Sequence, residues 1–257
     1  MPEPARDVVL DAVFNLRDLG GYPTADGRRT RWRRLYRGAG LHRLADDDVD
    51  VVRGLELRTV IDLRTAEELA SLGGYPVAEL PAAFHHLPMI QGLWDHAVVD
   101  PEAPPEAFLV PRYLEMLDVG RDTIAGSVRL LATPGALPAA FYCAAGKDRT
   151  GVLAALLLDA VGVRPEAVVE DYRLSKERVA LIVARARAKE HGEARSAMLG
   201  HPDAVMDSPP EAMRLLLAAI REHHGSTRGY LLQAGVRSDE LEALAVALLE
   251  PVSGAPS

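Results

Sequence analysis

Residues 141–151, FYCAAGKDRTG, combine the residue types of a site that binds and attacks a phosphoryl group. An apolar run ends at Cys143, a loop containing Gly146 follows, and Arg149 and Thr150 open the next apolar segment. Such a loop can turn consecutive backbone N–H groups toward an anion, with the N-terminus of the following helix behind it. We therefore expect phosphate to be bound by Ala144, Ala145, Gly146, Lys147 and Thr150.

Cys143 and Arg149 form a C-x5-R pattern whose two ends have complementary chemistry. A guanidinium group can donate two parallel hydrogen bonds to one phosphate. Positive surroundings favour the thiolate form of a cysteine, which is its nucleophilic form. The Thr150 hydroxyl can stabilise that sulfur when it leaves again. The pattern predicts that Cys143 and Arg149 are catalytic.

Strand and helix patterns alternate over the first 164 residues. Residues 59–64 are typical of a buried strand, and residues 65–68 (TAEE) follow with a capping box that opens a helix. Further strands are expected at 33–38, 84–89 and 136–142, and further helices at 46–53, 122–132 and 150–163. This alternation predicts an α/β fold with a mostly parallel, twisted sheet flanked by helices. Because ligands bind at the carboxyl ends of such strands, Cys143, Asp62 and Arg37 are expected on one rim.

Beyond residue 164 the apolar spacing is purely helical. We expect a single domain over residues 7–251, in which residues 175–225 form a helical, lid-like insertion over the site. Residues 1–6 and 252–257 have the composition of loose tails.

The composition narrows the function classes. The chain has 257 residues and a net charge of −8, which argues against a nucleic-acid partner. No apolar run approaches the roughly 20 residues of a membrane helix, and the first residues lack the pattern of a secretory signal. We expect a cytoplasmic protein without an integral membrane segment, with unconventional export left open. The single cysteine excludes a multi-cysteine metal site, and we expect neither metal nor cofactor.

The loop sequence AGKDRTG resembles that of bacterial tyrosine and lipid phosphatases in the cysteine-dependent protein tyrosine phosphatase superfamily. Further blocks resemble this family in the same order: NLRDLGG (15–21), LYRG (35–38), VIDLR (60–64), DYRLS (171–175) and GYLL (229–232). The resemblance implies a protein tyrosine phosphatase-like fold and a metal-independent hydrolysis of phosphomonoesters through a phosphocysteine. It implies phosphorylated protein (phosphotyrosine or phosphoserine/threonine) or phosphoinositide substrates, and Lys147 is similar to the extra cation of lipid-phosphatase loops.

Tyr142 departs from the family pattern, in which most members have His before the nucleophile. We expect Tyr142 either to form a hydrogen bond in place of that His or to leave the thiolate of Cys143 less favoured. The departure bears on the rate of catalysis more than on phosphate binding.

Two carboxylates compete for the role of general acid. Asp148 lies inside the loop, where the family pattern has an Asp, and its alternative role is to brace the loop. Asp95 follows the strand expected at 84–89, where related phosphatases often have a mobile acid loop, and its alternative is an ordinary loop carboxylate.

Several residues are expected around the site rather than in it. Asp62 and Arg64 end a buried strand and are expected to brace the loop from behind. Six arginines lie within residues 28–37, either on a solvated hairpin or on a surface that makes transient contact with anionic lipid or acidic phosphopeptide. Arg37 could instead turn inward toward the site.

Two other functions fit the same loop. A rhodanese-type sulfurtransferase also presents a cysteine on an anion-binding loop, and persulfide formation from thiosulfate would identify it. A non-catalytic phosphate-binding module, compatible with Tyr142, would bind phosphate without turnover. The sequence leaves the oligomeric state undetermined.

Overall fold

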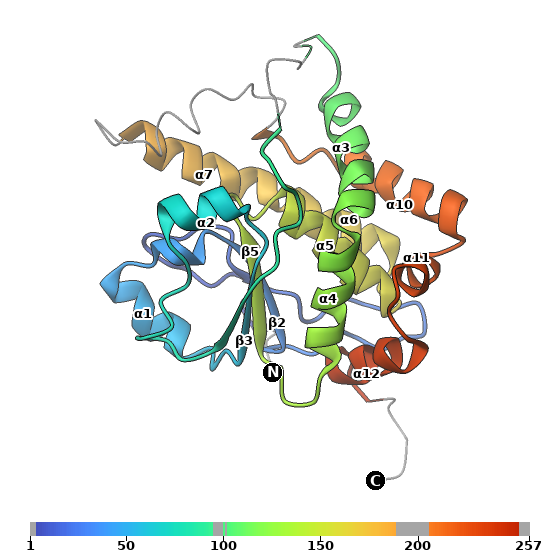
Figure 1. Cartoon of the computed structure of the whole chain (residues 1–257), viewed down its shortest axis with the longest axis horizontal. Helices are drawn as coiled ribbons and strands as arrows, with labels where there is room; N and C mark the ends of the chain where they lie inside the picture. The colour runs from blue at the N-terminus through green and yellow to red at the C-terminus, as the bar shows by residue number, and fades with distance from the viewer. Residues whose placement is uncertain (1–3, 95–99, 101, 189–205, 252–257) are drawn as a thin grey trace.

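A five-stranded sheet with strand order β1-β2-β5-β3-β4 forms the centre of the protein (Figure 1). This computed structural model describes residues 4–94, 100, 102–188 and 206–251. The strands are β1 (Arg17–Asp18), β2 (Leu35–Ala39), β3 (Thr59–Asp62), β4 (Ala83–His86) and β5 (Ala139–Cys143). Only β1 pairs antiparallel, with β2, so the predicted mostly parallel sheet is confirmed.

Helices cover both faces of the sheet (Figure 1). Those before β5 are η1 (Leu41–Arg43), α1 (Asp46–Arg53), α2 (Ala66–Leu72), α3 (Pro105–Val119) and α4 (Arg121–Ala132). Those after it are α5 (Asp148–Ala160), α6 (Pro165–Arg173), α7 (Ser175–Ala188), α10 (Pro210–His224), α11 (Thr227–Gln233) and α12 (Ser238–Leu248).

The sheet separates two hydrophobic clusters because successive side chains of a strand point to opposite faces. Ala140 and Tyr142 of β5 belong to the smaller cluster, together with Val52 of α1. Phe141 and Cys143 belong to the larger cluster, which also contains residues of α3–α6 and α10–α12. Tyr142 and Cys143 therefore lie on opposite faces of the sheet.

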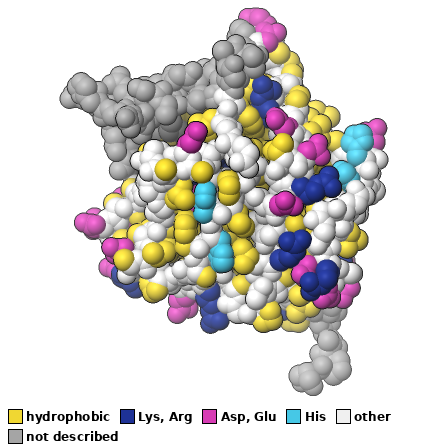
Figure 2. Space-filling view, in the orientation of Figure 1, with side chains coloured by type: hydrophobic (Ala, Val, Ile, Leu, Met, Phe, Trp, Pro, Cys, Tyr) yellow, Lys and Arg dark blue, Asp and Glu magenta, His cyan; other side chains and the backbone are white. Residues whose placement is uncertain are grey.

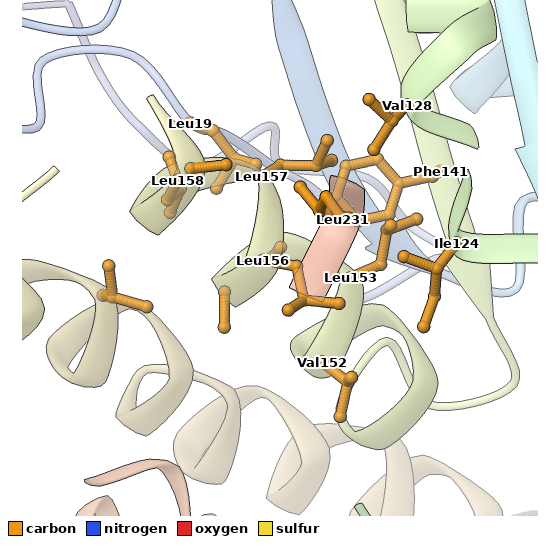
Figure 3. Close-up of a cluster of buried hydrophobic side chains, with 14 of the residues drawn as sticks. Leu19, Ile124, Val128, Phe141, Val152, Leu153, Leu156, Leu157, Leu158 and Leu231 are labelled. Atoms are coloured by element: carbon orange, nitrogen blue, oxygen red, sulfur yellow. The ribbon is translucent and has the colours of Figure 1, made fainter. Parts of the chain in front are cut away.

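Helix α5 is buried along almost its whole length. Figure 3 shows its side chains, among them Leu153 and Leu156, between Phe141 of β5, Ile124 of α4 and Leu231 of α11. A helix enclosed in this way is held rigidly, since packed interiors leave few voids. Its first turn contains Asp148 and Arg149, so the fold fixes the base of both side chains.

The bounds of several elements differ from expectation. The strand expected at 84–89 ends at His86, where its pairing with β3 ends. Strand β5 begins at Ala139 and includes Cys143, and α5 begins at Asp148 rather than at residue 150. Helix α3 was not predicted, because Pro105 and Pro111 resemble loop punctuation although Pro105 occupies the first turn, where proline is tolerated.

The segment expected to be lid-like contains α7 and α10. Helix α10 packs into the larger cluster through Met213, Leu216 and Ile220. Helix α7 lies at the end of the sheet where β5 delivers Cys143 (Figure 1). The domain bounds 7–251 and the lid-like role of 175–225 stay predictions.

The charges on the surface and the lengths of the helices are relevant to the partners that the protein can contact. On the face shown in Figure 2, basic side chains are interspersed with acidic ones. Residues of α4 and α12 form such pairs, as Arg129 does with Glu240. Within the described ranges, no helix combines the length and the apolar character needed to cross a membrane.

Candidate active site

The loop of residues 143–149 connects the end of β5 to the first turn of α5. Its ends are buried: Cys143 is 2% exposed and Arg149 is 7% exposed. Gly146 has a φ of +66°, and a Cβ atom there would lie 2.5 Å from the carbonyl oxygen of Gly38 on β2. The loop can therefore pack on β2 only with glycine at this position.

The carbonyl groups of the loop are bound from the side of β1 and β2. Asn15 donates from Nδ2 to the carbonyl oxygens of Ala145 and Gly146, both at 3.0 Å. Arg37 donates from Nη2 to the carbonyl oxygen of Gly146 at 2.8 Å and to that of Lys147 at 3.4 Å. Because C=O and N–H of one trans peptide point in opposite directions, these bonds turn the following N–H groups away from β2. Such a row of N–H groups is suited to an anion.

The buried carboxylate of Asp171 accepts hydrogen bonds from side chains that position the loop. Asp171 of α6 accepts hydrogen bonds from Arg17 Nε at 2.9 Å, Tyr22 Oη at 2.8 Å and Arg37 Nη1 at 2.5 Å. Arg17 also donates from Nη1 to the side-chain oxygen of Asn15. We call Asn15, Arg17, Tyr22, Arg37 and Asp171 the Asp171 cluster. Burial alone would raise the pKa of Asp171, but the charges of Arg17 and Arg37 hold it below its ordinary value.

Glu68 of α2 sets the orientation of Arg149. The two side chains form a bidentate pair, with Nη1 to Oε2 at 2.5 Å and Nη2 to Oε1 at 3.1 Å. The carboxylate of Glu68 also accepts from the N–H of Thr65 at 2.8 Å, which confirms the predicted capping box. Burial would lower the pKa of Arg149, but Cys143 and Glu68 raise it above its ordinary value, so the guanidinium stays charged. The sequence pattern marks Glu68 only as a helix cap and gives no sign of its contact with Arg149.

Tyr142 is bound to the pair expected to brace the loop. Its hydroxyl donates to Asp62 Oδ2 at 2.7 Å, and Arg64 donates to the same oxygen at 2.6 Å. Arg64 also donates to the carbonyl oxygen of Gly73, which ties the pair to the end of α2. Burial and the charge of Asp62 raise the pKa of Tyr142, so its hydroxyl remains a donor. These three side chains brace β5 from the face opposite Cys143.

Lys147 and Asp148 contact one another at the end of the loop. Lys147 is 1% exposed, lies 3.1 Å from Asp148 Oδ1 and donates to the carbonyl oxygen of Asp207 at 2.7 Å. Asp148 is partly exposed and accepts from Tyr113 Oη at 2.6 Å. Thr150 is buried, and its hydroxyl has no hydrogen-bond partner in the part of the chain that the structure describes. Asp95, the rival acid, lies outside the described residues.

Three of the arginines within residues 28–37 have separate contacts, and the predicted surface for anionic lipid or acidic phosphopeptide stays a prediction. Arg37 is completely buried and faces the loop. Arg28 pairs with Asp26, and Arg31 donates from Nε to the carbonyl oxygen of Leu249 at 2.5 Å.

Gly146→Ala should displace the loop and weaken its affinity for inorganic phosphate by about tenfold or more, since misplacement by ~1 Å is costly for oriented groups. Isothermal titration calorimetry measures this affinity. Gly162→Ala is the matched control, because its φ is +87° but nothing lies within 4 Å of the added Cβ. It should lose some stability and keep its phosphate affinity; equal affinity in both variants would contradict the packing argument.

Asp171→Asn should lower the free energy of unfolding at pH 7 by about 3–5 kcal/mol, because two buried guanidinium groups lose their counter-charge. The folded-state pKa of Asp171 lies below its unfolded value. The stabilisation is therefore present above about pH 4 and is lost as the pH falls further, so parent and variant should converge in acid.

Urea unfolding at several pH values measures the difference in free energy of unfolding between the parent and Asp171→Asn. Asp239→Asn, which removes an exposed carboxylate paired with Arg237, should leave stability nearly unchanged, because solvent screens exposed ion pairs. A constant difference between parent and Asp171→Asn down to strongly acidic pH would contradict the assignment of the charge.

The chain is similar to known proteins over most of its length. The model of the tyrosine phosphatase family matches residues 8–250. A Cupriavidus necator protein named as a tyrosine-protein phosphatase is 32% identical over 240 residues, covering 89% of this chain and 84% of the relative. A tyrosine-protein phosphatase of Nostoc commune is 28% identical over 222 residues, covering 82% and 73%. The triple specificity protein phosphatase PtpB of Mycobacterium tuberculosis is 30% identical over 268 residues, covering 88% and 93%.

The family match spans the sheet, the 143–149 loop and the Asp171 cluster together, in agreement with the resemblance seen in the loop sequence. This chain belongs to the tyrosine phosphatase family.

Proposed function

We propose that this protein hydrolyses phosphomonoesters, with phosphotyrosine as its main substrate, through a phosphocysteine formed on Cys143. The observation that carries the proposal is the loop itself, whose carbonyl groups are bound by Asn15 and Arg37 while Cys143 and Arg149 stand at its two ends. The names of the relatives, tyrosine and triple-specificity phosphatases, support the same reaction class.

In the first step the Cys143 thiolate attacks phosphorus and a sulfur–phosphorus bond forms. The bond from phosphorus to the leaving oxygen breaks, and that oxygen takes the proton of Asp148. Arg149 and the loop N–H groups bind the other phosphoryl oxygens, where donors fixed in advance stabilise the transition state. The bidentate pair with Glu68 fixes the orientation of the Arg149 guanidinium for this contact.

In the second step water attacks phosphorus and the sulfur–phosphorus bond breaks. The Asp148 carboxylate takes a proton from that water, and the thiolate leaves with the help of the Thr150 hydroxyl. Inorganic phosphate is released, and both Cys143 and Asp148 return to their starting states.

The environment of Lys147 supports phosphotyrosine over phosphoinositide as the main substrate. Its ammonium group contacts Asp148 and the carbonyl oxygen of Asp207, so these groups compete with any further phosphate. A release assay with a phosphotyrosine peptide, a phosphoserine peptide and a phosphoinositide panel tests this order. Faster release from a phosphoinositide would overturn it.

Cys143→Ser should lower turnover of a phosphotyrosine peptide by about 10⁴-fold or more and retain phosphate binding, because a serine hydroxyl is not ionised at neutral pH. Phosphate release and calorimetry measure the two properties. Activity within tenfold of the parent would exclude the covalent mechanism. Persulfide formation from thiosulfate without phosphate release would favour the sulfurtransferase, and binding without turnover in the parent would favour the binding module.

Asp148→Asn should slow phenyl phosphate by about 10²–10⁴-fold and p-nitrophenyl phosphate much less, because a poor leaving oxygen needs its proton in the transition state. Asp159→Asn is the matched control: it lies on the same helix, pairs with Arg221 and should slow neither substrate. If Asp95→Asn alone shows the steep dependence on the leaving group, Asp95 is the acid. Equal losses on both substrates would indicate damage to the loop.

A further inference from the structure

Two tyrosines form a hydrogen-bonded chain that ends on the carboxylate of Asp148. Tyr172 Oη lies 2.6 Å from Tyr113 Oη, and Tyr113 Oη lies 2.6 Å from Asp148 Oδ1. Tyr113 comes from α3 and Tyr172 from α6, so the chain joins three helices. The two rings also pack edge to face, with centroids 6.1 Å apart.

The hydroxyl groups of both tyrosines stay protonated and can donate hydrogen bonds. Tyr113 is 0% exposed and Tyr172 is 1% exposed. Burial and the nearby charge of Asp148 raise the pKa of each hydroxyl above its ordinary value. Because the carboxylate accepts from Tyr113, the remaining proton of the chain runs from Tyr172 to Tyr113.

The contacts of Asp148 are unequal between its two oxygens. Oδ1 receives the Tyr113 hydroxyl at 2.6 Å and lies 3.1 Å from the Lys147 ammonium. These two donors occupy both lone pairs of Oδ1. Among the described residues, both of these contacts fall on Oδ1 and neither falls on Oδ2. A proton on this carboxyl group therefore belongs on Oδ2.

We propose that Tyr113, held by Tyr172, is a positioning residue that fixes Oδ1 of Asp148 and thereby presents Oδ2 as the atom that passes the proton to the leaving oxygen. This inference rests on the proposed role of Asp148 as general acid. It adds which oxygen carries the proton and which side chains outside the loop aim it.

Tyr113→Phe removes the hydroxyl and keeps the ring, so it tests the aim of the acid. It should slow phenyl phosphate by about tenfold, a part of the 10²–10⁴-fold supplied by acid catalysis, and slow p-nitrophenyl phosphate by less than about twofold. Tyr172→Phe should show the same preference with a smaller loss, because it acts through Tyr113.

Tyr230→Phe is the matched control. Tyr230 is equally buried, and its hydroxyl donates at 2.6 Å to the carbonyl oxygen of Leu117, a backbone group outside the 143–149 loop. It should lose stability to a similar degree without changing the ratio of the two substrate rates. If Tyr113→Phe slows both substrates equally, as a structural effect would, the inference is overturned.

The double variant Tyr113→Phe/Asp148→Asn separates this inference from the proposed function. If Tyr113 acts through Asp148, the double variant should be no slower on phenyl phosphate than Asp148→Asn alone, since coupled residues do not add. Additive losses would overturn the inference while leaving the acid role of Asp148 intact. If Asp148→Asn itself shows no dependence on the leaving group, the acid assignment fails first, and the inference fails with it.

Discussion

Two guanidinium groups, those of Arg17 and Arg37, lie fully buried against the single carboxylate of Asp171. Removing three charges from water is costly, and such an arrangement is weak evidence for stability by itself. Its importance lies in the contacts that the remaining nitrogens of the two guanidinium groups make. Arg37 binds loop carbonyls directly, and Arg17 orients Asn15, which binds two of them. The conformation of the loop thus depends on a buried charge cluster that lies outside the loop itself.

Helix α6 contributes to the site through two successive residues that face different partners. Asp171 faces the arginines of β1 and β2, whereas Tyr172 faces Tyr113 of α3. Because successive helical residues are separated by about 100° around the axis, one short helix connects the arginines of β1 and β2 with the tyrosine that contacts Asp148. Its packing against α5 and α10 therefore holds both contacts in place at once.

Motifs formed by neighbouring residues could be predicted from the sequence, whereas contacts between residues far apart in the chain could not. The C-x5-R loop, the buried strand β3 and the capping box of Thr65 and Glu68 each depend on residues that lie within a few positions of one another. The contacts that complete the site join residues far apart: Arg37 and Asp171 are 134 positions apart, Arg149 and Glu68 are 81 apart, and Tyr113 and Asp148 are 35 apart. The blocks NLRDLGG and DYRLS marked Asn15, Arg17 and Asp171 through resemblance, but no single-sequence pattern indicates that they meet. Helix α3 carries Tyr113 and was hidden by its two prolines.

The enclosure of Cys143 also bears on the redox chemistry of the protein. These 257 residues contain no second sulfhydryl group, so a sulfenic acid formed at this position has no partner in them for an intramolecular disulfide. Two reversible fates remain: condensation with a backbone nitrogen to a sulfenamide, or capture by a thiol from solution. With Cys143 only 2% exposed, an external thiol must be small to reach the sulfur. The burial of Cys143 therefore limits which reductants can restore the thiol after oxidation.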